Sequence, residues 1–296
     1  MASASSPILV LDSGLGGLTV IRALRRAMPM EHILYFGDTA RVPYGTKSAG
    51  TVTTFVRQII QYLHHHEPKH VVFACNTATA LSLQALRAEF PHLSMSGVIE
   101  PGARAAVEAA GQKLRPMIGI VGTDATIRSR AYERAIVRRR QHARILSRST
   151  PLLVPIIEEG RAQDDPLVKL AIQQYLAPLI ERQIDVLVLG CTHYPIYKQA
   201  IVQALTPGVP VIDSAERCAE DVLRRLRTAR LERQAGAAGS LRCFVTDDAP
   251  RFAMLASRFL GIQMDLPAWV SLDDLHAATM TAGSALSDRV ELQEAV

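Results

Sequence analysis

The sequence predicts an α/β protein with two similar domains, each a mostly parallel sheet flanked by helices, and a functional site in the cleft between them. Short apolar, β-branched runs alternate with amphipathic helical segments, which is typical of βαβ units. The order of these parts repeats along the chain. Two of the apolar runs also end in a cysteine, at the edge where parallel sheets bind ligands.

The expected strands are short apolar runs, and the segments between them carry helical periodicity. We predict strands at residues 7–11, 33–36, 70–74, 117–121, 152–157, 186–189, 209–212 and 241–245. Apolar residues spaced for one helical face occur at 52–63 and 215–226, and a further helix is expected at 251–260. Residues 233–240 are rich in Gly and Ala and predict a loop, and the segment after about residue 270 is weakly patterned.

The repeat predicts two units of similar design. Ser13 and Thr123 each follow an apolar run and lie 110 positions apart. Cys75 and Cys191 lie 116 positions apart. Pro and Gly indicate where the chain crosses between the units, at residues 98–102 and 207–210. We expect the C-terminal segment to return to the first unit, which gives a discontinuous domain of residues 1–98 plus 211–296 and a second domain of residues 99–210.

Length and composition favour a globular protein of two domains. The chain has 296 residues, of which 48% are hydrophobic and 21% charged. No apolar run reaches the roughly 18–20 residues that span a bilayer. The N-terminus lacks the basic and apolar regions of a secretory signal, and the four cysteines match no zinc or disulfide spacing. We therefore expect a cytoplasmic protein with free thiols and no membrane association.

The net charge of +5 is accompanied by three basic clusters, at residues 138–140, 224–225 and 227. Solvated helix faces explain such clusters best. Nucleic-acid binding is the alternative, but no recognition motif and no interleaved aromatic residues accompany the charge. We therefore expect no nucleic-acid partner.

Two polar loops follow the first two predicted strands. In Asp12-Ser-Gly-Leu-Gly-Gly17, small residues open a helix whose N-terminus favours an anion, a carboxylate as easily as a phosphate. Asp12 does not suit such a site, and it could equally cap the helix. Residues 37–45 form either an ordinary loop or a pocket wall, stiffened by Pro43 and ended by Gly45.

The four cysteines differ in how well their surroundings suit chemistry. Cys75 follows an apolar run and could be a small buried hydrophobe. Cys191 is followed closely by His193, and an imidazole there can accept or orient a proton. Cys218 lies on an apolar helix face and Cys243 inside a strand, so both are predicted to be structural. No phosphate-loop lysine, nicotinamide motif or nucleophile elbow occurs, so we expect thiol chemistry with no cofactor and no metal.

Six segments together resemble the glutamate racemase family, within the cofactor-independent aspartate/glutamate racemase superfamily. They are Leu11-Asp-Ser-Gly-Leu-Gly-Gly-Leu-Thr-Val20, Gly37-Asp-Thr-Ala-Arg-Val-Pro-Tyr-Gly45, Ala74-Cys-Asn-Thr-Ala-Thr79, Gly122-Thr-Asp-Ala-Thr-Ile127, Val154-Pro-Ile-Ile-Glu158 and Gly190-Cys-Thr-His-Tyr-Pro195. Each is weak alone, but the six are specific when found together in the family's order. The family's usual Phe before Asp-Ser is Leu11 here, and its frequent Cys before Pro151 is Thr150.

This resemblance implies that two cysteines interconvert L- and D-glutamate, and that the D-glutamate supplies bacterial peptidoglycan synthesis. Cys75 would act on D-glutamate with help from Asp12, and Cys191 on L-glutamate with help from His193. The residues implied to bind or line the substrate site are Asp12, Ser13, Pro43, Tyr44, Gly45, Cys75, Asn76, Thr77, Thr123, Thr192 and His193, with Asp38 and Glu158 as weaker candidates. We also expect a homodimer in a bacterial cytoplasm.

Two thiols suit this reaction chemically. A free thiol has a pKa near 8.5, so both protonation states are reachable close to neutral pH. The α-proton of an amino acid is far less acidic, so the site must stabilise a developing carbanion electrostatically. Three alternatives remain: aspartate racemase or another two-cysteine epimerase, a non-catalytic basic nucleic-acid-binding regulator on the same fold, and a metal protein using Cys75, Cys191 and His193. The combination of Asp-Ser-Gly-x-Gly-Gly with Cys-Thr-His-Tyr-Pro favours glutamate.

Overall fold

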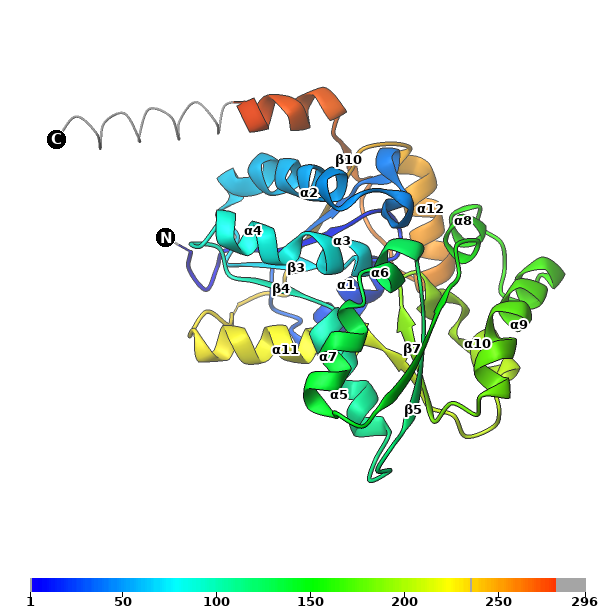
Figure 1. Ribbon diagram of the computed structural model, residues 1–296. Helices are drawn as coiled ribbons and strands as arrows, with labels where there is room; N and C mark the ends of the chain where they lie inside the picture. Colours follow the sequence, from blue (N-terminus) through cyan, green and yellow to red (C-terminus); the bar gives the residue numbers. More distant parts are fainter. Residues whose placement is uncertain (1, 235, 281–296) are drawn as a thin grey trace.

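Two parallel β-sheets, each flanked by helices, make up the computed structural model, which describes residues 2–234 and 236–280 (Figure 1). The six-stranded sheet has the order β10-β9-β2-β1-β3-β4, and the four-stranded sheet has the order β6-β5-β7-β8. The strands are β1 (Ile8–Asp12), β2 (Ile33–Gly37), β3 (His70–Phe73), β4 (Met95–Gly97), β5 (Met117–Gly122), β6 (Arg144–Ser149), β7 (Val186–Gly190), β8 (Val211–Asp213), β9 (Leu241–Val245) and β10 (Ala268–Trp269). The predicted α/β class is confirmed.

The two sheets repeat one strand order. The first four strands are arranged 2-1-3-4, and β5 to β8 follow the same arrangement, with β5 in the place of β1 and β7 in the place of β3. In the six-stranded sheet the order changes direction between β1 and β3, and in the four-stranded sheet it changes direction between β5 and β7. Such a switch point is where open parallel sheets bind ligands, at the carboxyl ends of the strands.

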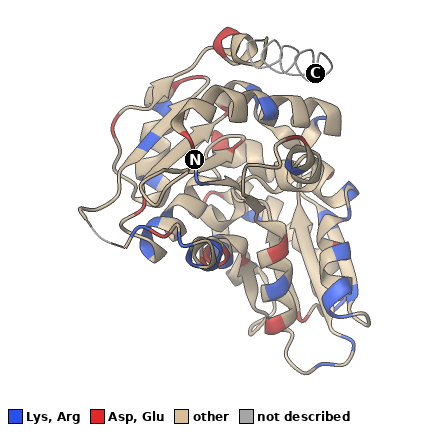
Figure 2. Cartoon of the chain, turned by 90° about the vertical axis from the view of Figure 1, so that its left-hand side faces the viewer, with Lys and Arg blue, Asp and Glu red and all other residues tan. Residues whose placement is uncertain are grey.

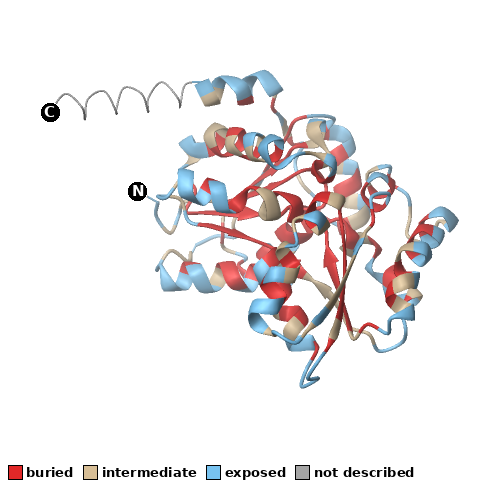
Figure 3. Cartoon of the chain, viewed as in Figure 1, coloured by how far each residue is buried: buried red, intermediate tan, exposed pale blue. Residues whose placement is uncertain are grey.

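Side chains alternate between the two faces of each strand, and each face has its own layer of helices. In β1, Ile8 and Val10 pack toward α1 (Leu18–Ala27), α11 (Ser214–Thr228) and α12 (Ala249–Leu260). Leu9 and Leu11 pack toward the opposite layer, which consists of α2 (Ala49–Leu63), α3 (Asn76–Leu81) and α4 (Leu83–Glu89). Figure 3 shows the resulting pattern, with buried strands inside and the outer faces of the helices exposed.

The four-stranded sheet is covered in the same way. One face carries α5 (Ile99–Ala109) and α7 (Ala131–Arg139), and the other carries α8 (Leu153–Glu158), α9 (Pro166–Glu181) and α10 (Lys198–Ala204). The short helix α6 (Asp124–Arg128) follows β5, and 3₁₀ turns occur at Thr39–Arg41, Tyr44–Thr46, His64–His66 and Tyr194–Tyr197. One hydrophobic cluster extends from the α1, α11 and α12 layer to the α8, α9 and α10 layer, so the two units share a core.

The predicted strand at residues 152–157 is wrong, because this segment forms α8. A short buried apolar run has the same hydrophobic content in a strand and in a helix, so periodicity cannot separate them. Pro155 lies in the first turn of the helix, where its missing N–H has no intrahelical partner to lose. The chain does pass from the six-stranded to the four-stranded sheet through residues 98–102, but Pro101 and Gly102 do not interrupt regular structure there, because both lie inside α5.

Three strands were not expected from the sequence: β4, β6 and β10. β6 is an edge strand of sequence Arg-Ile-Leu-Ser-Arg-Ser and is mostly half-buried, so it lacks a continuous apolar run. β8 pairs with β7 in the four-stranded sheet. A domain boundary placed by sheet membership would therefore follow Asp213, whereas the predicted boundary lies at residue 211. β9 pairs with β2, which brings the chain back to the six-stranded sheet. Residues 272–280 are helical, and the rest of the weakly patterned tail, 281–296, lies outside the described residues.

The basic clusters have acidic neighbours. Arg138 and Arg139 both pair with Glu100. Arg224 and Arg225 pair with Asp221, all three on α11. Figure 2 shows Lys and Arg close to Asp and Glu along the same helices. These pairs offset the local positive charge, as expected for solvated helix faces.

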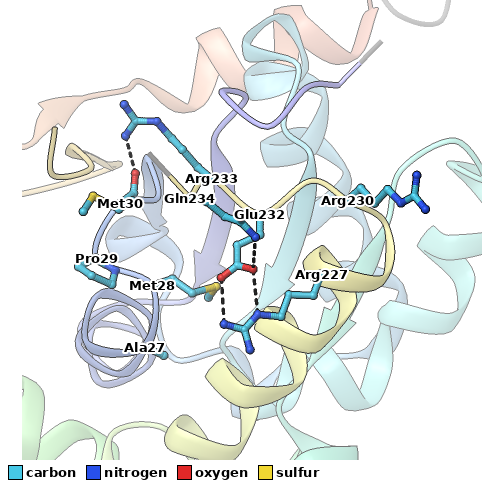
Figure 4. Close-up of a pocket in the computed structure, with 9 residues that line it drawn as sticks. All are labelled: Ala27, Met28, Pro29, Met30, Arg227, Arg230, Glu232, Arg233 and Gln234. Carbon is cyan, nitrogen blue, oxygen red and sulfur yellow. Dashed lines mark hydrogen bonds and ion pairs between the residues drawn. The ribbon is translucent and has the colours of Figure 1, made fainter. Parts of the chain in front are cut away.

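Of the other arginines in these clusters, Arg140 donates to the backbone oxygens of Gly111 and Lys113, and Arg227 borders a cavity of about 610 Å³ (Figure 4). There it forms a two-pronged ion pair with Glu232, while Arg233 donates to the backbone oxygen of Met30. None of the cysteines lines this cavity. No helix in the described part of the chain has both the length and the apolar character that a membrane crossing requires.

Candidate active site

The candidate site is built from four loops, each of which follows a strand beside one of the two switch points. Ser13 follows β1 and Cys75 follows β3, and these strands pair with each other. Thr123 follows β5 and Cys191 follows β7, which pair in the same way. The two thiols therefore occupy corresponding places in the two units. Each cysteine is only 6% exposed.

The Cys75 thiol lies against the first turn of α3. The backbone N–H of Ala78 donates to Sγ at 3.5 Å, and Sγ donates to the Ser13 hydroxyl at 3.8 Å. Burial raises the pKa of Cys75 to about 12, the nearby Asp12 carboxylate adds to the increase, and the N–H group of Ala78, which donates to the sulfur, opposes it. In this state the group is a neutral thiol and a proton donor.

Asp12 is buried beside Cys75 and organises the loop that precedes α1. Its Oδ2 accepts from the N–H groups of Gly14 and Gly17 at 3.1 and 2.9 Å, and its Oδ1 accepts from the Thr192 hydroxyl at 3.4 Å. Burial raises the pKa of Asp12, although the positive charge of His193 opposes this. The Asp12 carboxyl group therefore occupies the N–H groups of Gly14 and Gly17, which an external anion could otherwise have bound. Neither interpretation from sequence describes these contacts fully, because Asp12 binds amides of the loop in place of an anion, while the N-cap of α1 is Gly17 without a side-chain cap.

On the other side, Cys191, His193 and Glu158 form a chain of contacts. Cys191 Sγ lies 3.7 Å from His193 Nδ1, and His193 Nε2 lies 2.6 Å from Glu158 Oε1. Burial lowers the pKa of His193, but its hydrogen bonds to Cys191 and Glu158 outweigh this and raise the pKa well above the usual value. Burial raises the pKa of Glu158, but the bond from His193 outweighs it and lowers the pKa. The result is an imidazolium–carboxylate pair placed to exchange a proton with Cys191.

Two glycines allow loops of one unit to touch residues of the other. A Cβ atom on Gly16 would lie 2.5 Å from His193 Nδ1, and one on Gly45 would lie 2.5 Å from Thr123 Cβ. Both distances are shorter than a non-bonded carbon contact allows, so any side chain would displace the partner. The glycine-rich loop is therefore required for packing against the Cys191 loop.

Hydroxyl and amide groups fill the space between the Cys75 and Thr123 loops. The hydroxyls of Thr77, Thr123 and Thr126 are within 2.9–3.2 Å of one another and join α3 to α6. Asn76 Oδ1 accepts from the hydroxyl of Tyr132 at 2.8 Å. Its Nδ2 atom is buried and has no hydrogen-bond partner among the residues that the structure describes. A buried donor of this kind is expected to meet a ligand or water, because leaving it unpaired costs about 1–3 kcal/mol.

Asp38 holds the loop of residues 37–45 and has its oxygens occupied by protein groups. It accepts from Arg41 Nε at 2.7 and 2.9 Å, from the Thr246 hydroxyl at 3.0 Å, and from the Tyr44 hydroxyl. The Val42–Pro43 bond in this loop is cis. Asp38 therefore positions Tyr44, while Gly45 at the end of the loop meets Thr123.

Several contributing residues have no signal in the sequence. Tyr132 lies in ordinary helical sequence. Thr126 and Leu15, whose N–H donates to Glu158 at 3.1 Å, lie within two of the six segments, but nothing in those segments indicates these contacts. Only their tertiary partners reveal them. Cys218 and Cys243 are buried away from these loops, in α11 and β9. In residues 2–234 and 236–280, no group of three or more His, Cys, Asp or Glu side chains could hold a metal ion.

Comparison with known proteins shows which family the chain resembles. The family model described as Asp/Glu/Hydantoin racemase matches residues 8–222. A glutamate racemase of Syntrophus aciditrophicus is 44% identical over 255 residues, covering 86% of this chain and 93% of that protein. A crystal structure of a glutamate racemase isoform from Bacillus anthracis has a TM-score of 0.84 at 38% identity, covering 90% of this chain and 98% of that one. The Francisella tularensis glutamate racemase in complex with D-glutamate has a TM-score of 0.83 at 33% identity, covering 91% and 99%.

Proposed function

The chain belongs to the Asp/Glu/Hydantoin racemase family, and we propose that it interconverts L- and D-glutamate through two cysteine acid/base groups. As a member of this family it is an amino-acid racemase, which is an isomerase. The observation that carries the proposal is the pair of buried thiols at corresponding strand ends, each beside its own titratable neighbour. The choice of glutamate as substrate is supported by the relatives, which are named for it at about 40% identity over most of the chain.

Racemisation at Cα needs one group to remove a proton from one face and another to supply a proton to the opposite face. We assign these roles to Cys75, acting on D-glutamate, and Cys191, acting on L-glutamate. Asp12 and His193 assist the proton transfer on their respective sides. The groups differ in chemistry, because one side has a buried carboxyl with a raised pKa and the other a histidine paired with Glu158. The two half-reactions are therefore chemically distinct.

In this proposal the polar groups around the two thiols bind the substrate. We propose that Asn76 donates through Nδ2 to the α-carboxylate, since this atom is buried without a protein partner. Ser13, Thr77 and Thr192 contribute hydroxyl and backbone groups for the carboxylate and ammonium. Further residues that line the site in this proposal are Pro43, Tyr44, Gly45 and Thr123. Fixed donors of this kind stabilise charge that develops when Cα loses its proton.

The biological setting follows from the same proposal. D-Glutamate produced here supplies peptidoglycan synthesis in a bacterial cytoplasm. We propose that the enzyme works as a homodimer, with no cofactor and no nucleic-acid partner. We also propose the division into a discontinuous first domain, residues 1–98 plus 211–296, and a second domain, residues 99–210.

The test is to follow the optical rotation of pure L-glutamate with dialysed, chelator-treated enzyme, in parallel with L-aspartate. We expect the rotation of glutamate to fall to zero and that of aspartate to stay constant. Cys75→Ala and Cys191→Ala should each abolish the activity, because every turnover uses both faces. Cys218→Ala and Cys243→Ala are matched controls and should keep most of it. Near-normal turnover by either site variant, or activity that returns only when metal is added, would contradict the two-thiol mechanism.

A further inference from the structure

The side chain of Tyr132 connects the two cysteine loops. Its hydroxyl donates to Oδ1 of Asn76, the residue after Cys75, at 2.8 Å. Its ring packs beside Gly190, the residue before Cys191, where a Cβ atom would lie 3.4 Å from the ring. Tyr132 belongs to α7 of the second unit and Asn76 to α3 of the first. One side chain therefore sets the relative position of the two loops that carry the thiols.

The phenol oxygen also lies where the chain crosses between the sheets. A Cβ atom on Gly102, in α5, would lie 3.1 Å from the Tyr132 oxygen and 3.1 Å from Ser214 Cβ. Ser214 is the first residue of α11, directly after β8. The helix α5 carries the chain from the first sheet to the second, and α11 carries it back. The hydrogen bond to Asn76 thus joins the units beside both crossings.

The direction of hydrogen bonding at this oxygen decides how the Asn76 amide is turned. Burial raises the pKa of Tyr132, so the phenol keeps its hydrogen near neutral pH. The hydrogen of Tyr132 then remains for Oδ1 of Asn76. With Oδ1 engaged, the amide presents Nδ2, which is buried and unpaired. An N–H donor is complementary to a carboxylate and not to an ammonium group.

We propose that Tyr132 is a positioning residue that fixes the Asn76 amide with its N–H groups available to the α-carboxylate of the substrate. The assignment rests on the proposed function, because it places an amino acid at the two thiols. Without the phenol hydroxyl, the amide can turn and present its oxygen to the carboxylate. Tyr132 therefore acts on substrate affinity through Asn76 and touches neither reacting proton.

Tyr132→Phe removes the hydroxyl and keeps the ring that packs beside Gly190. We expect KM for both enantiomers to rise about 3- to 15-fold with kcat largely retained, as loss of one hydrogen bond in the bound state predicts. Tyr175→Phe is the matched control. That tyrosine lies on α9, and its hydroxyl accepts from the N–H of Leu152 at 3.4 Å, a residue outside both cysteine loops. Removal of this hydroxyl should therefore leave KM unchanged.

Two further measurements separate positioning from general destabilisation. In a double-mutant cycle, Tyr132→Phe should add little to the KM of Asn76→Ala, because the amide it orients is already gone. The inhibition constant of 2-hydroxyglutarate, which keeps the α-carboxylate, should rise in Tyr132→Phe. That of 4-aminobutyrate, which lacks this carboxylate, should not change.

The outcomes distinguish this inference from the proposed function. If the unmodified enzyme does not racemise glutamate, the proposed function fails. If it does, and Tyr132→Phe leaves KM unchanged or has its full effect in the Asn76→Ala background, only the role of Tyr132 is overturned. Equal changes in the inhibition constants of both inhibitors would also overturn it. Should Tyr132→Phe unfold, Tyr132→Leu provides the second variant, because it also removes the hydroxyl and keeps an apolar side chain beside Gly190, and it should raise KM in the same carboxylate-dependent way.

Discussion

Replacing Glu158 by Gln tests whether the pair that His193 forms with Glu158 is ionic. The two atoms lie 2.6 Å apart, the histidine side chain is 3% exposed and the glutamate side chain 22% exposed. Gln has nearly the same size and can still accept a hydrogen bond from Nε2, so the substitution removes the charge alone. Hydrogen bonds to charged groups contribute about 1.5–3 kcal/mol and neutral ones roughly half as much, so we expect a loss of about 1–2 kcal/mol in the free energy of unfolding near neutral pH.

The pH dependence of this loss carries the sharper prediction. The folded pKa of His193 lies above its unfolded value, so its contribution is fully present below the unfolded pKa and is lost as pH rises through the folded pKa. The folded pKa of Glu158 is lowered, so its contribution is present above the unfolded pKa and is lost as pH falls through the folded pKa. Both contributions are complete between the ordinary values of 4.5 and 6.5. The difference between the two proteins should be largest in this window and shrink on either side.

Chemical denaturation across the pH range measures this difference directly. Glu159→Gln is the control, since Glu159 follows Glu158 in sequence but is 61% exposed and pairs with Arg161, so its loss should cost no more than about 0.5 kcal/mol. In activity assays, the alkaline limb of the kcat/KM profile should move to lower pH in Glu158→Gln, because His193 then loses its proton earlier. A stability difference that stays constant from about pH 5 to pH 10 would refute the ionic pair.

Two further predictions concern the asymmetry of the site and its closure. His193→Asn should alter the primary isotope effect with α-deuterated L-glutamate more than with α-deuterated D-glutamate, and Asp12→Asn should do the reverse. The value of kcat/KM must stay equal for the two enantiomers, because they have equal free energy. Identical changes of the isotope effect in both directions would exclude the assignment of sides. Gly45→Ala should destabilise the protein by about 1–3 kcal/mol and raise KM, since its Cβ would lie 2.5 Å from Thr123 Cβ. Gly50→Ala, in α2 with no atom within 4 Å of the new Cβ, should instead raise the thermal midpoint, and equal midpoints for the two variants would contradict the close contact.

The interpretation from sequence succeeded where local pattern carries the information. Continuous apolar runs predicted the central strands, because a strand covered on both faces excludes polar residues along its whole length. The position of Cys75 and Cys191 at strand ends followed from the same runs. It failed at residues 152–157, where a short apolar run fits a buried strand and a buried helix equally, and at β6, whose polar edge residues lack the pattern.

The amino-acid order by itself determined which residues stand at the carboxyl ends of the strands, since strand ends are local features. The partners of these residues were decided by the tertiary structure. Glu158 reaches His193 across 35 positions, and Tyr132 reaches Asn76 across 56. Gly16 and Gly45 must lack a side chain because His193 and Thr123 of the other unit lie against them. No periodicity encodes such pairs, because they depend on how two sheets pack against each other. Burial at that contact raises the pKa values of Asp12 and Cys75, while the hydrogen bonds to Cys191 and Glu158 raise that of His193 against the effect of burial.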